Sequence, residues 1–538
     1  MSSSSPIEAR RIIGRHLVLD GAGAVVELPP GSIESALPRL RHGLRVLGWD
    51  VEPAWRFHQQ GATLGIRAWP DVLEEAVDLL EWAAGDDDDV PLGRLARRAS
   101  RWASPRAREL YQRFPGLVFE GEDRFTVGLG VHARSWPQSE PPSVDEVGSP
   151  RGVPMATITG TNGKTTTTRL LAHILSQAGL TVGSCTSGGV IIGADTVERG
   201  DWTGPGAARR VLRDNRVQVA VLETARGGLL RRGLAVDGAE VAVVTNVTSE
   251  HLGRYGVDTV EDLARAKLVI AQGLRRGGIL VLPAVSDPIY AALPALRAAR
   301  PDIRLWTFGS RGPGRGLAGW ADDQRLYIGD GSVALHEIPI CFSGTARHNV
   351  ENALCAALAA VALGLPGEVI GNGLRSFRPS VEDNPGRMNL FRLPSGALVV
   401  LDFAHTWDGL LRVAEAVRAW PRSRRTLLIG QVGDRHDDEL FEFGRAVAAL
   451  APSRVVLKEV TSRQYESAPG RVPALLARGM AAAGVPRHIV EGPTPDESSG
   501  VRLALRGVGS DDLVVLLLHE GLTAALPVLR ELQAESVG

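Results

Sequence analysis

A glycine-rich loop joins an apolar strand to a helix in the segment ATITGTNGKTTTTRLL. The loop residues that could meet a nucleotide are Gly160, Thr161, Asn162, Gly163, Lys164, Thr165 and Thr166. Glycines let the backbone curl until its N–H groups point at phosphate oxygens, and a helix N-terminus adds partial positive charge. Lys164 would reach the β- and γ-phosphates, and the Thr165 hydroxyl would bind Mg²⁺. The segment therefore predicts an ATP site, although Ile158 stands where the usual phosphate-loop pattern has its first glycine.

Polar residues follow two further apolar runs of the chain. Glu223 ends the run VAVLE, and Asn246 and His251 follow the run VAVVT. Ligand sites in open α/β sheets lie at the carboxyl ends of strands, and a carboxylate there can hold a second Mg²⁺ between substrate and γ-phosphate. Taken singly, Asn246 or His251 would be an ordinary polar loop residue. Their repeated position at strand exits favours a metal and substrate site.

Lysine is scarce in this chain. Of the 60 basic residues, 57 are arginine and three are lysine, namely Lys164, Lys267 and Lys458. The two cations interchange on a solvated surface, but not where a compact charge or a neutral amine is needed. A lysine that persists among so many arginines is a candidate for chemistry, and chance survival is the alternative for each.

The pattern of apolar runs predicts an α/β fold. From residue 153 onward, short apolar runs alternate with amphipathic helices, which is typical of βαβ units and a mostly parallel sheet. We expect a small N-terminal α/β domain over 1–132, a central ATP-binding domain over 151–380 and a C-terminal domain over 381–538. The stretch 133–150 is rich in Pro, Ser and Glu and is predicted to be a linker.

Within the N-terminal domain, two extended runs are predicted to alternate with helices. The extended runs cover residues 17–28 and 51–68, and the helices are expected over 32–48, 70–85 and 91–114.

Composition narrows the possible partners. The formal net charge of −1 provides no electrostatic footprint for nucleic acid or an anionic membrane, and no stretch reaches ~18 apolar residues. The three cysteines have no metal-ligand spacing and cannot build a disulfide framework. We expect a cytoplasmic protein without nucleic-acid or membrane partners, and homo-oligomerisation stays open.

The motif ITGTNGKTTT resembles the phosphate loop of the Mur ligases, ATP-dependent amide-forming enzymes whose fold also includes folylpolyglutamate synthase. The phosphate loop of that family has fewer glycines than the usual pattern, which accounts for Ile158 at the position of the first glycine. The segment ETARGGLLRRGLAVDGAEVAVVTNVTSEHLGRYGVDTVEDLARAKLVI is similar to the Mur-ligase-like half of cyanophycin synthetase, and GATLGIRAWPDVLEEAVDLLEWA to part of its N-terminal domain. The resemblance implies a central phosphate-loop domain with a doubly wound parallel sheet and a C-terminal Rossmann-like α/β domain.

Roles for residues of the central domain are implied by this resemblance alone. Thr165, Glu223 and His251 would be Mg²⁺ ligands, and Lys267 occupies the place of the lysine that many Mur ligases carbamylate. In the segment HNVEN, Asn349 and Asn352 would contact adenine.

The C-terminal domain would supply the residues that grip phosphates and ribose. These are Arg387 in NPGRMNL and Asp402 in LDFAH, with His405 beside them, and a packed His405–Asp402 pair is the alternative. Trp407 stands where the family usually has proline, a departure that concerns the loop on the substrate side.

An acidic segment of the C-terminal domain could recognise a cationic substrate. Asp434, Asp437 and Asp438 could form a carboxylate fork for a guanidinium. A solvated acidic loop is the other interpretation.

The resemblance implies an ADP-forming ligase that joins a carboxylate to an amino acid amine through an acyl phosphate, with ATP and Mg²⁺. The acceptor would be a small-molecule or peptide carboxylate, and arginine is the default amine. Cyanophycin synthetase carries an ATP-grasp domain where this chain has the short linker, so we expect one amide per ATP and no backbone polymerisation by this chain. The alternatives are the activating subunit of a glutamine-dependent amidotransferase and a non-catalytic nucleotide-binding module.

Overall fold

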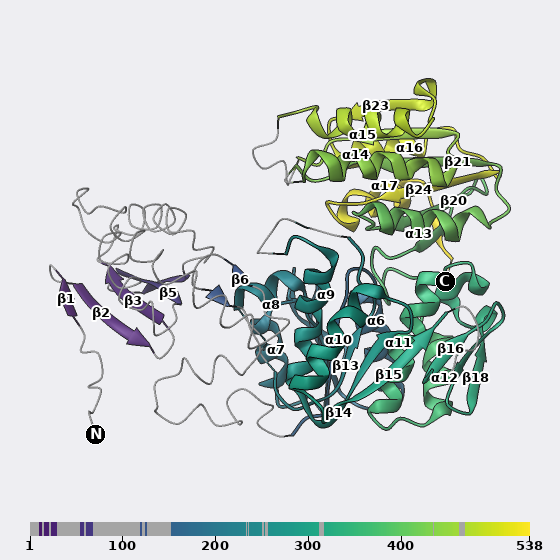
Figure 1. Ribbon diagram of the computed structural model, residues 1–538. Coiled ribbons are helices and arrows are strands. Elements are labelled where there is room, and N and C mark those ends of the chain that lie inside the picture. The colour runs from purple at the N-terminus through teal and green to yellow at the C-terminus, as the bar shows by residue number, and fades with distance from the viewer. Residues whose placement is uncertain are drawn as a thin grey trace, which may run out of the picture. The chain divides into compact units, whose positions relative to one another are not determined.

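The computed structural model describes residues 152–537 except 233, 235, 250–251, 253–256, 311–316, 434 and 462–467, and the backbone of seven short strands before residue 152 (Figure 1). The expected helices over 32–48, 70–85 and 91–114 and the expected linker over 133–150 lie outside the described residues. The chain forms two compact units: one comprises Met1–Thr159, Cys185–Leu280 and Ser286–Arg304, and the other Gly160–Ser184, Val281–Val285 and Leu305–Gly538.

The N-terminal strands form antiparallel hairpins. A five-stranded sheet has the order β1-β2-β3-β5-β4, and a separate pair joins β6 to β7. Their bounds are β1 Arg10–Ile12, β2 Arg15–Asp20, β3 Gly23–Leu28, β4 Ala54–His58, β5 Gly61–Arg67, β6 Phe119–Glu120 and β7 Arg124–Phe125. Each extended run of the sequence thus contains a hairpin, because Asp20 pairs with Gly23 and His58 with Gly61 across a two-residue connection.

An eleven-stranded sheet forms the centre of the chain, in the order β11-β10-β9-β12-β8-β13-β14-β15-β16-β17-β18. The bounds are β8 Met155–Thr159, β9 Val182–Thr186, β10 Gly189–Ile192, β11 Asp195–Arg199, β12 Val219–Glu223, β13 Ala239–Val244, β14 Leu274–Pro283, β15 Arg304–Gly309, β16 Gly319–Ala321, β17 Arg325–Ile328 and β18 Gly331–Ala334. The inner strand β8 is wholly buried and pairs in parallel with β12 and β13. All five of its residues are buried, Thr157 and Thr159 included, as expected of a strand covered on both faces.

The two ends of this sheet differ from the parallel pattern. β10 pairs with β11, β16 with β17, and β17 with β18, all antiparallel. The sequence analysis missed these strands because each has only three to five residues, too few to show an alternating pattern.

Helices and short 3-10 turns connect the strands of this sheet or follow its last strand along the chain. The helices are α6 Lys164–Gln177, α7 Pro205–Leu212, α8 Arg226–Arg232, α9 Val260–Leu268, α10 Asp287–Ala299, α11 Arg347–Ala362 and α12 Gly367–Ser376, with 3-10 turns η2 Val269–Gly273, η3 Leu335–Glu337 and η4 Pro339–Gly344. Thr259 begins α9 through a capping box with Asp262. Gly364 lies just beyond α11 at φ 88°, a left-handed conformation that suits the end of a helix.

The C-terminal sheet has seven strands in the order β23-β22-β21-β24-β20-β19-β25. They are β19 Asn389–Arg392, β20 Leu398–Asp402, β21 Arg424–Ile429, β22 Arg454–Lys458, β23 Val490–Thr494, β24 Asp512–Leu517 and β25 Glu535–Ser536. Among the inner strands, β20 is parallel to β24, β24 to β21, and β21 to β22, whereas β19 joins antiparallel toward the edge. These four parallel strands therefore end at one edge of the sheet.

Helices cover both faces of the C-terminal sheet. They are α13 Trp407–Arg418, α14 Asp437–Ala446, α15 Arg471–Ala482, α16 Glu497–Ala504 and α17 Leu526–Glu531, with 3-10 turns η5 Val447–Leu450, η7 Arg487–Ile489 and η8 Leu522–Ala524. Val400 packs in a core with Leu410 of α13, whereas its neighbour Val399 packs in a second core with Val501 of α16. The alternation along β20 confirms a doubly wound α/β arrangement.

None of the helices in the described residues combines the length and the apolar composition that crossing a membrane requires.

Candidate active site

The glycine-rich loop follows β8 directly and leads into α6. Gly160 and Gly163 have φ of 153° and 84°, a conformation that side chains rarely adopt. The Lys164 ammonium donates to the carbonyl oxygens of Gly160 at 2.9 Å and Thr161 at 2.7 Å. The lysine therefore lies against its own loop, within reach of any anion that the loop holds.

Two buried asparagines of α11 support this loop from beneath. The Asn352 amide donates to the Asn349 side chain at 3.0 Å, and the Asn349 amide donates to the carbonyl of Ile340 at 2.8 Å. The Thr167 hydroxyl donates to Asn352 Oδ1 at 3.4 Å. A Cβ on Gly163 would stand 2.1 Å from the same oxygen. Contact of Asn349 and Asn352 with adenine stays a prediction, and both side chains are engaged in internal hydrogen bonds.

A chain of polar contacts links the loop to α13 and α11. Asn162 donates its side-chain amide to Asp408 at 3.0 Å, and the Arg412 guanidinium donates to Asp408 at 3.0 Å and to Glu351 at 3.1 Å. The Ser310 hydroxyl donates to the other oxygen of Glu351 at 2.9 Å. Sequence analysis missed this chain, because its members lie far apart in sequence and no local pattern joins them.

Glu223 stands where the parallel strand β12 ends, as the sequence predicted. It pairs with Ile158 of β8, two residues before the glycine-rich loop begins. Its side chain is 3% exposed and accepts the backbone N–H of Ser187 at 3.3 Å. Burial, with the Glu223 charge, raises the pKa of Cys185, so that thiol stays protonated and inert. The role of Glu223 as a metal ligand stays a prediction.

The segment after β13 stays beside the end of β8, because the Thr245 N–H donates to the carbonyl of Thr159 at 2.9 Å. Asn246 follows directly and is half-buried. His251, the third predicted metal ligand, lies outside the described residues.

Lys267 is buried on α9. Its side chain is only 3% exposed, so it is not a solvated cation on a helix face. Its modification stays a prediction.

Arg387, Asp402 and His405 come together around one buried carboxylate. Asp402 ends β20 and accepts the backbone N–H groups of Met388 at 2.9 Å and Ala404 at 2.7 Å. Burial raises the pKa of Asp402, while Arg387, the two N–H groups and His405 oppose the shift. The Arg387 guanidinium lies 5.0 Å from the centre of the Phe403 ring. Asp402 thus accepts two backbone N–H groups, and His405 Nδ1 lies 3.1 Å from the carbonyl oxygen of Phe403.

Trp407 occupies the first position of α13, and Thr406 caps the helix by accepting the Gly409 N–H at 3.1 Å. Proline is well tolerated at this first position, since the N–H there has no helical partner. Tryptophan in place of the family's proline therefore leaves the start of the helix intact, and Trp407 is exposed.

The acidic segment of the C-terminal domain begins a helix. Asp437 lies in the first turn of α14 and forms an ion pair with Arg471, while Asp438 is exposed. Asp434 lies outside the described residues. Asp437 thus already binds a guanidinium of this chain, which favours the solvated structural interpretation over a substrate fork.

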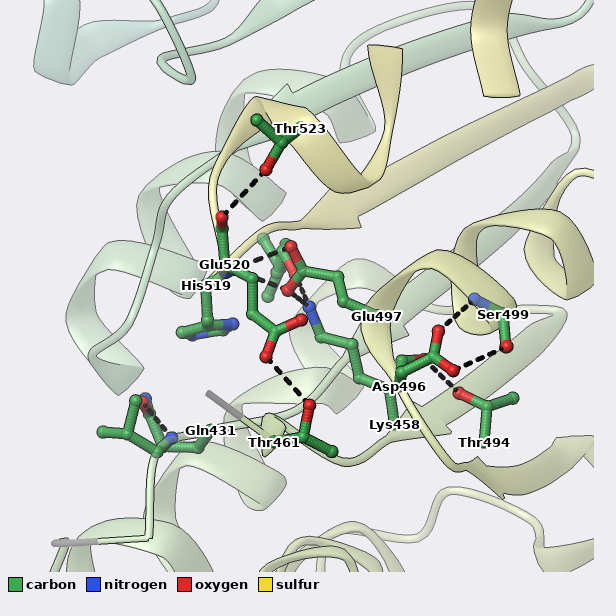
Figure 2. Close-up of polar contacts among 12 residues, drawn as sticks. Gln431, Lys458, Thr461, Thr494, Asp496, Glu497, Ser499, His519, Glu520 and Thr523 are labelled. Carbon is green, nitrogen blue, oxygen red and sulfur yellow. Dashed lines mark hydrogen bonds and ion pairs between the residues drawn. The ribbon is translucent and has the colours of Figure 1, made fainter. Parts of the chain in front are cut away.

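A buried charged cluster lies at the carboxyl edge of the C-terminal sheet (Figure 2). Lys458 ends β22 and forms an ion pair with Glu497, the first residue of α16, and both side chains are 0% exposed. His519 follows β24, is 4% exposed, and makes no regular hydrogen bond through either ring nitrogen among the described residues. The scarcity of lysine, which made Lys458 a candidate for chemistry, was the only feature of the sequence that indicated this cluster.

The donor atoms present fit ATP and Mg²⁺. The Thr165 hydroxyl and the Glu223 carboxylate are oxygen ligands of the kind that Mg²⁺ prefers, and the two left-handed glycines leave the loop backbone bare for phosphate. In the part of the chain that the structure describes, no group of three or more His, Cys, Asp or Glu side chains is arranged to hold a metal ion.

Replacing Gly163 by alanine tests the packing of the loop. A Cβ would contact Asn352 at 2.1 Å, and the left-handed backbone adds ~1–2 kcal/mol of strain. We expect Gly163→Ala to weaken ATP binding at least tenfold in calorimetry. Gly179→Ala is the matched control, since that residue has φ 77° but nothing within 4 Å of the added Cβ. The interpretation is wrong if both variants bind ATP as wild type does.

Acid should destabilise the C-terminal domain through His519. Burial, followed by the charges of Lys458, His405 and Arg435, lowers its pKa well below the ordinary 6.5. The unfolded chain then binds a proton that the folded chain does not, so stability falls as pH drops below ~6.5, by up to ~1.4 kcal/mol per pH unit. Urea denaturation should show a shallower loss between pH 6.5 and 5 in His519→Gln. Parallel curves for wild type and variant would contradict the assignment.

Comparison with known proteins places these features in a family. Residues 158–360 match the Mur ligase middle domain, and residues 386–517 match the Mur ligase glutamate ligase domain. The cyanophycin synthetase of Synechocystis sp. is 41% identical over 345 residues, which cover 62% of this chain and 39% of that protein. That of Geminocystis herdmanii is 36% identical over 405 residues, 72% of this chain and 44% of that protein. The chain thus spans about two fifths of the length of these relatives.

Another relative is matched by this chain over most of the relative's own length. The UDP-N-acetylmuramoyl-L-alanyl-D-glutamate–2,6-diaminopimelate ligase of Xanthomonas campestris is 30% identical over 382 residues, 67% of this chain and 71% of that protein. The solved bifunctional folylpolyglutamate synthase/dihydrofolate synthase of Yersinia pestis shares the fold, with a TM-score of 0.52, 18% identity, and coverage of 76% of this chain and 94% of that one. The chain belongs to the Mur ligase family.

Proposed function

We propose that this chain is an ADP-forming ligase that joins a carboxylate to the amine of an amino acid. The observation that carries the proposal is the glycine-rich loop, with its two left-handed glycines and the Lys164 ammonium held against the loop carbonyls. Membership of the Mur ligase family supports the same class of reaction, since the relatives of this chain include cyanophycin synthetases and a diaminopimelate ligase.

The proposed reaction needs no nucleophilic side chain. A carboxylate oxygen of the acceptor attacks the γ-phosphorus of ATP, the bond to the β-phosphate oxygen breaks, and ADP leaves. The amine nitrogen then attacks the acyl carbon of the acyl phosphate, inorganic phosphate leaves, and the nitrogen loses a proton. The protein has to offset charge and align the reactants, and these two effects account for most of the catalysis of phosphoryl transfer.

Residues of the chain divide these tasks. Lys164 would leave the loop carbonyls to offset charge on the β- and γ-phosphates. Arg387, beside Asp402, would contribute a second cation to the nucleotide. When bound, Mg²⁺ would neutralise further phosphate charge, with Thr165, Glu223 and His251 as the proposed ligands.

Substrate identity follows from the relatives as a proposal. The similarity to cyanophycin synthetases makes arginine the first amine to test, and an acidic peptide the first carboxylate acceptor. We assign acceptor binding to the domain over 1–132, the ATP site to the domain over 151–380, and the incoming amine to the domain over 381–538. The cytoplasm, where ATP is abundant, is the proposed location.

Turnover should release ADP and require Mg²⁺. A panel of amino acids, ammonia and glutamine is tested with acidic peptides, and the adenine nucleotide is followed by chromatography. We expect ADP only with an amino acid and an acceptor together. Release of AMP would contradict the acyl-phosphate route. Release of ADP with ammonia as the only nitrogen donor that works would indicate an amidotransferase subunit, and no turnover with any donor would indicate a binding module.

Lys164→Ala should lower kcat by several powers of ten. Arg445→Ala, which removes an exposed cation of α14, should not lower kcat.

Arginine should be unable to replace Lys267. If CO₂ converts the buried amine to a carbamate, a guanidinium cannot replace it, since it stays protonated at any accessible pH. Lys267→Arg should abolish ligation while ATP affinity changes less than twofold, and Lys267→Ala should regain activity when a short carboxylic acid is added. Arg265→Lys, the reverse exchange on the same helix, is the control. Near-normal turnover in Lys267→Arg would show that this position needs only positive charge.

A further inference from the structure

The Lys458–Glu497 pair holds a turn of backbone rather than a side chain. The Glu497 carboxylate accepts the backbone N–H of His519 at 2.7 Å and that of Glu520 at 3.1 Å, one on each oxygen. The Lys458 ammonium donates to Glu497 and also to the carbonyl of Leu517. Figure 2 shows the lysine reaching this carboxylate beside the turn that carries His519 and Glu520. Residues 517–520 are therefore fixed by one buried ion pair.

Glu497 is itself held in place at the start of α16. Asp496 caps the helix by accepting the Ser499 N–H at 2.7 Å, and the Thr494 hydroxyl donates to the Asp496 carbonyl at 3.0 Å. These contacts fix the backbone from which the Glu497 side chain extends toward the turn.

The space around Lys458 admits only an unbranched aliphatic stem. A Cβ on Gly430 would stand 2.7 Å from Lys458 Cγ, and one on Gly500 would stand 3.4 Å from Lys458 Cβ. Gly430 and Gly500 therefore leave the room that the aliphatic stem of Lys458 occupies.

Stability alone does not account for the pair. Removing two charges from water is costly, and well-packed apolar residues in place of a buried ion pair often stabilise a protein equally well or better. An apolar pair could not accept two backbone N–H groups. The Lys458–Glu497 pair therefore orders the turn at the edge of the sheet where the parallel strands end. Ligands of such sheets bind at that edge.

The turn carries a buried side chain whose hydrogen bonding is incomplete within the described residues. His519 is 4% exposed, and within the described residues neither ring nitrogen makes a regular hydrogen bond, although the backbone of Leu517 interacts weakly with the ring. Its ring centre lies 5.9 Å from that of Phe403, whose ring also contacts the Arg387 guanidinium. A polar group of a ligand would complete the hydrogen bonding of this imidazole, as buried polar groups normally require.

We propose that the Lys458–Glu497 pair is a positioning element for substrate binding, which fixes the turn at 517–520 so that the His519 imidazole meets a polar group of the amino acid substrate. The pair touches no reactant and acts through the backbone of the turn. The identity of the ligand in this inference rests on the proposed function. The effect of the Lys458–Glu497 pair on the turn does not depend on it.

The test replaces the charged pair by a neutral one of similar shape. Lys458→Met/Glu497→Gln removes both charges and leaves one amide oxygen for two N–H groups. Hydrogen-exchange mass spectrometry on the peptide covering 517–523 should show at least tenfold faster exchange, with the core strands β20 and β21 unchanged. With arginine and an acidic peptide, the KM for arginine should rise at least tenfold, and the KM for ATP should stay within twofold.

The matched control lies at the other end of the same strand. Arg454, the first residue of β22, pairs with Glu491 through contacts of 2.7 and 3.0 Å on the surface. Arg454→Met/Glu491→Gln makes the same chemical change and should alter neither the exchange of 517–523 nor either KM.

Three results separate the possibilities. Unchanged exchange of the 517–523 peptide in the folded double variant would overturn the proposal, and so would an unchanged KM for arginine. A merely structural pair would lower the urea midpoint and leave the ratio of the two KM values as in wild type. If the double variant does not fold, Glu497→Gln alone is measured in the same way. If wild type turns over no amino acid, the proposed function fails, and hydrogen exchange still decides whether the pair holds the turn.

Discussion

The backbone at Gly163 lies so close to Asn352 that no side chain fits between them. This contact joins the phosphate loop to α11, two segments that are far apart in the sequence. It depends on a glycine in the left-handed conformation and on an asparagine whose amide is already engaged with Asn349. The curvature of the loop, and hence the direction of its N–H groups, follows from this packing. A phosphate site of this kind is made by backbone, and it needs support from side chains that lie beneath the loop.

Both sheets place their functional groups where parallel strands end. In the central sheet, the exit of β8 becomes the glycine-rich loop, and the exit of β12 carries Glu223. In the C-terminal sheet, Asp402, Lys458 and His519 stand at or just after the ends of β20, β22 and β24. Parallel strands leave their last carbonyl groups and side chains on one edge, because the connecting helices return the chain to the opposite edge. The chemistry of the chain is concentrated at these edges for that topological reason.

Buried charge serves different purposes at different places. Asp402 accepts two backbone N–H groups, and so does Glu497, so each carboxylate orders a turn at the end of a strand. Arg412 bridges Asp408 and Glu351, and so connects helices α13 and α11. Such groups cost free energy to bury, and they remain favourable only because nearly every oxygen has a donor. His519 is one of several buried polar groups that lack a regular hydrogen bond within the described residues, and its place just after the end of β24 is what makes it a candidate for contact with a ligand.

The sequence alone predicted much of this protein. Continuous apolar runs indicated the buried parallel strands, since both faces of such strands are covered, and the pattern around Lys164 indicated a phosphate loop, since its spacing is local. Glu223 at a strand exit was predicted for the same reason. The antiparallel strands at the ends of the central sheet were missed, because they are too short to show a pattern.

Only the tertiary structure decided which distant residues meet. Nothing local to Asn352 indicates that it supports Gly163, and nothing near Lys458 indicates that it grips Glu497 and through it the turn at His519. Asp437 could have been a substrate ligand until its ion pair with Arg471 was seen. Spacing along the chain determines helices, strands and tight loops, because their hydrogen bonds are between near neighbours. Contacts between the ends of different strands depend on the order of strands in the sheet, which the local pattern does not contain.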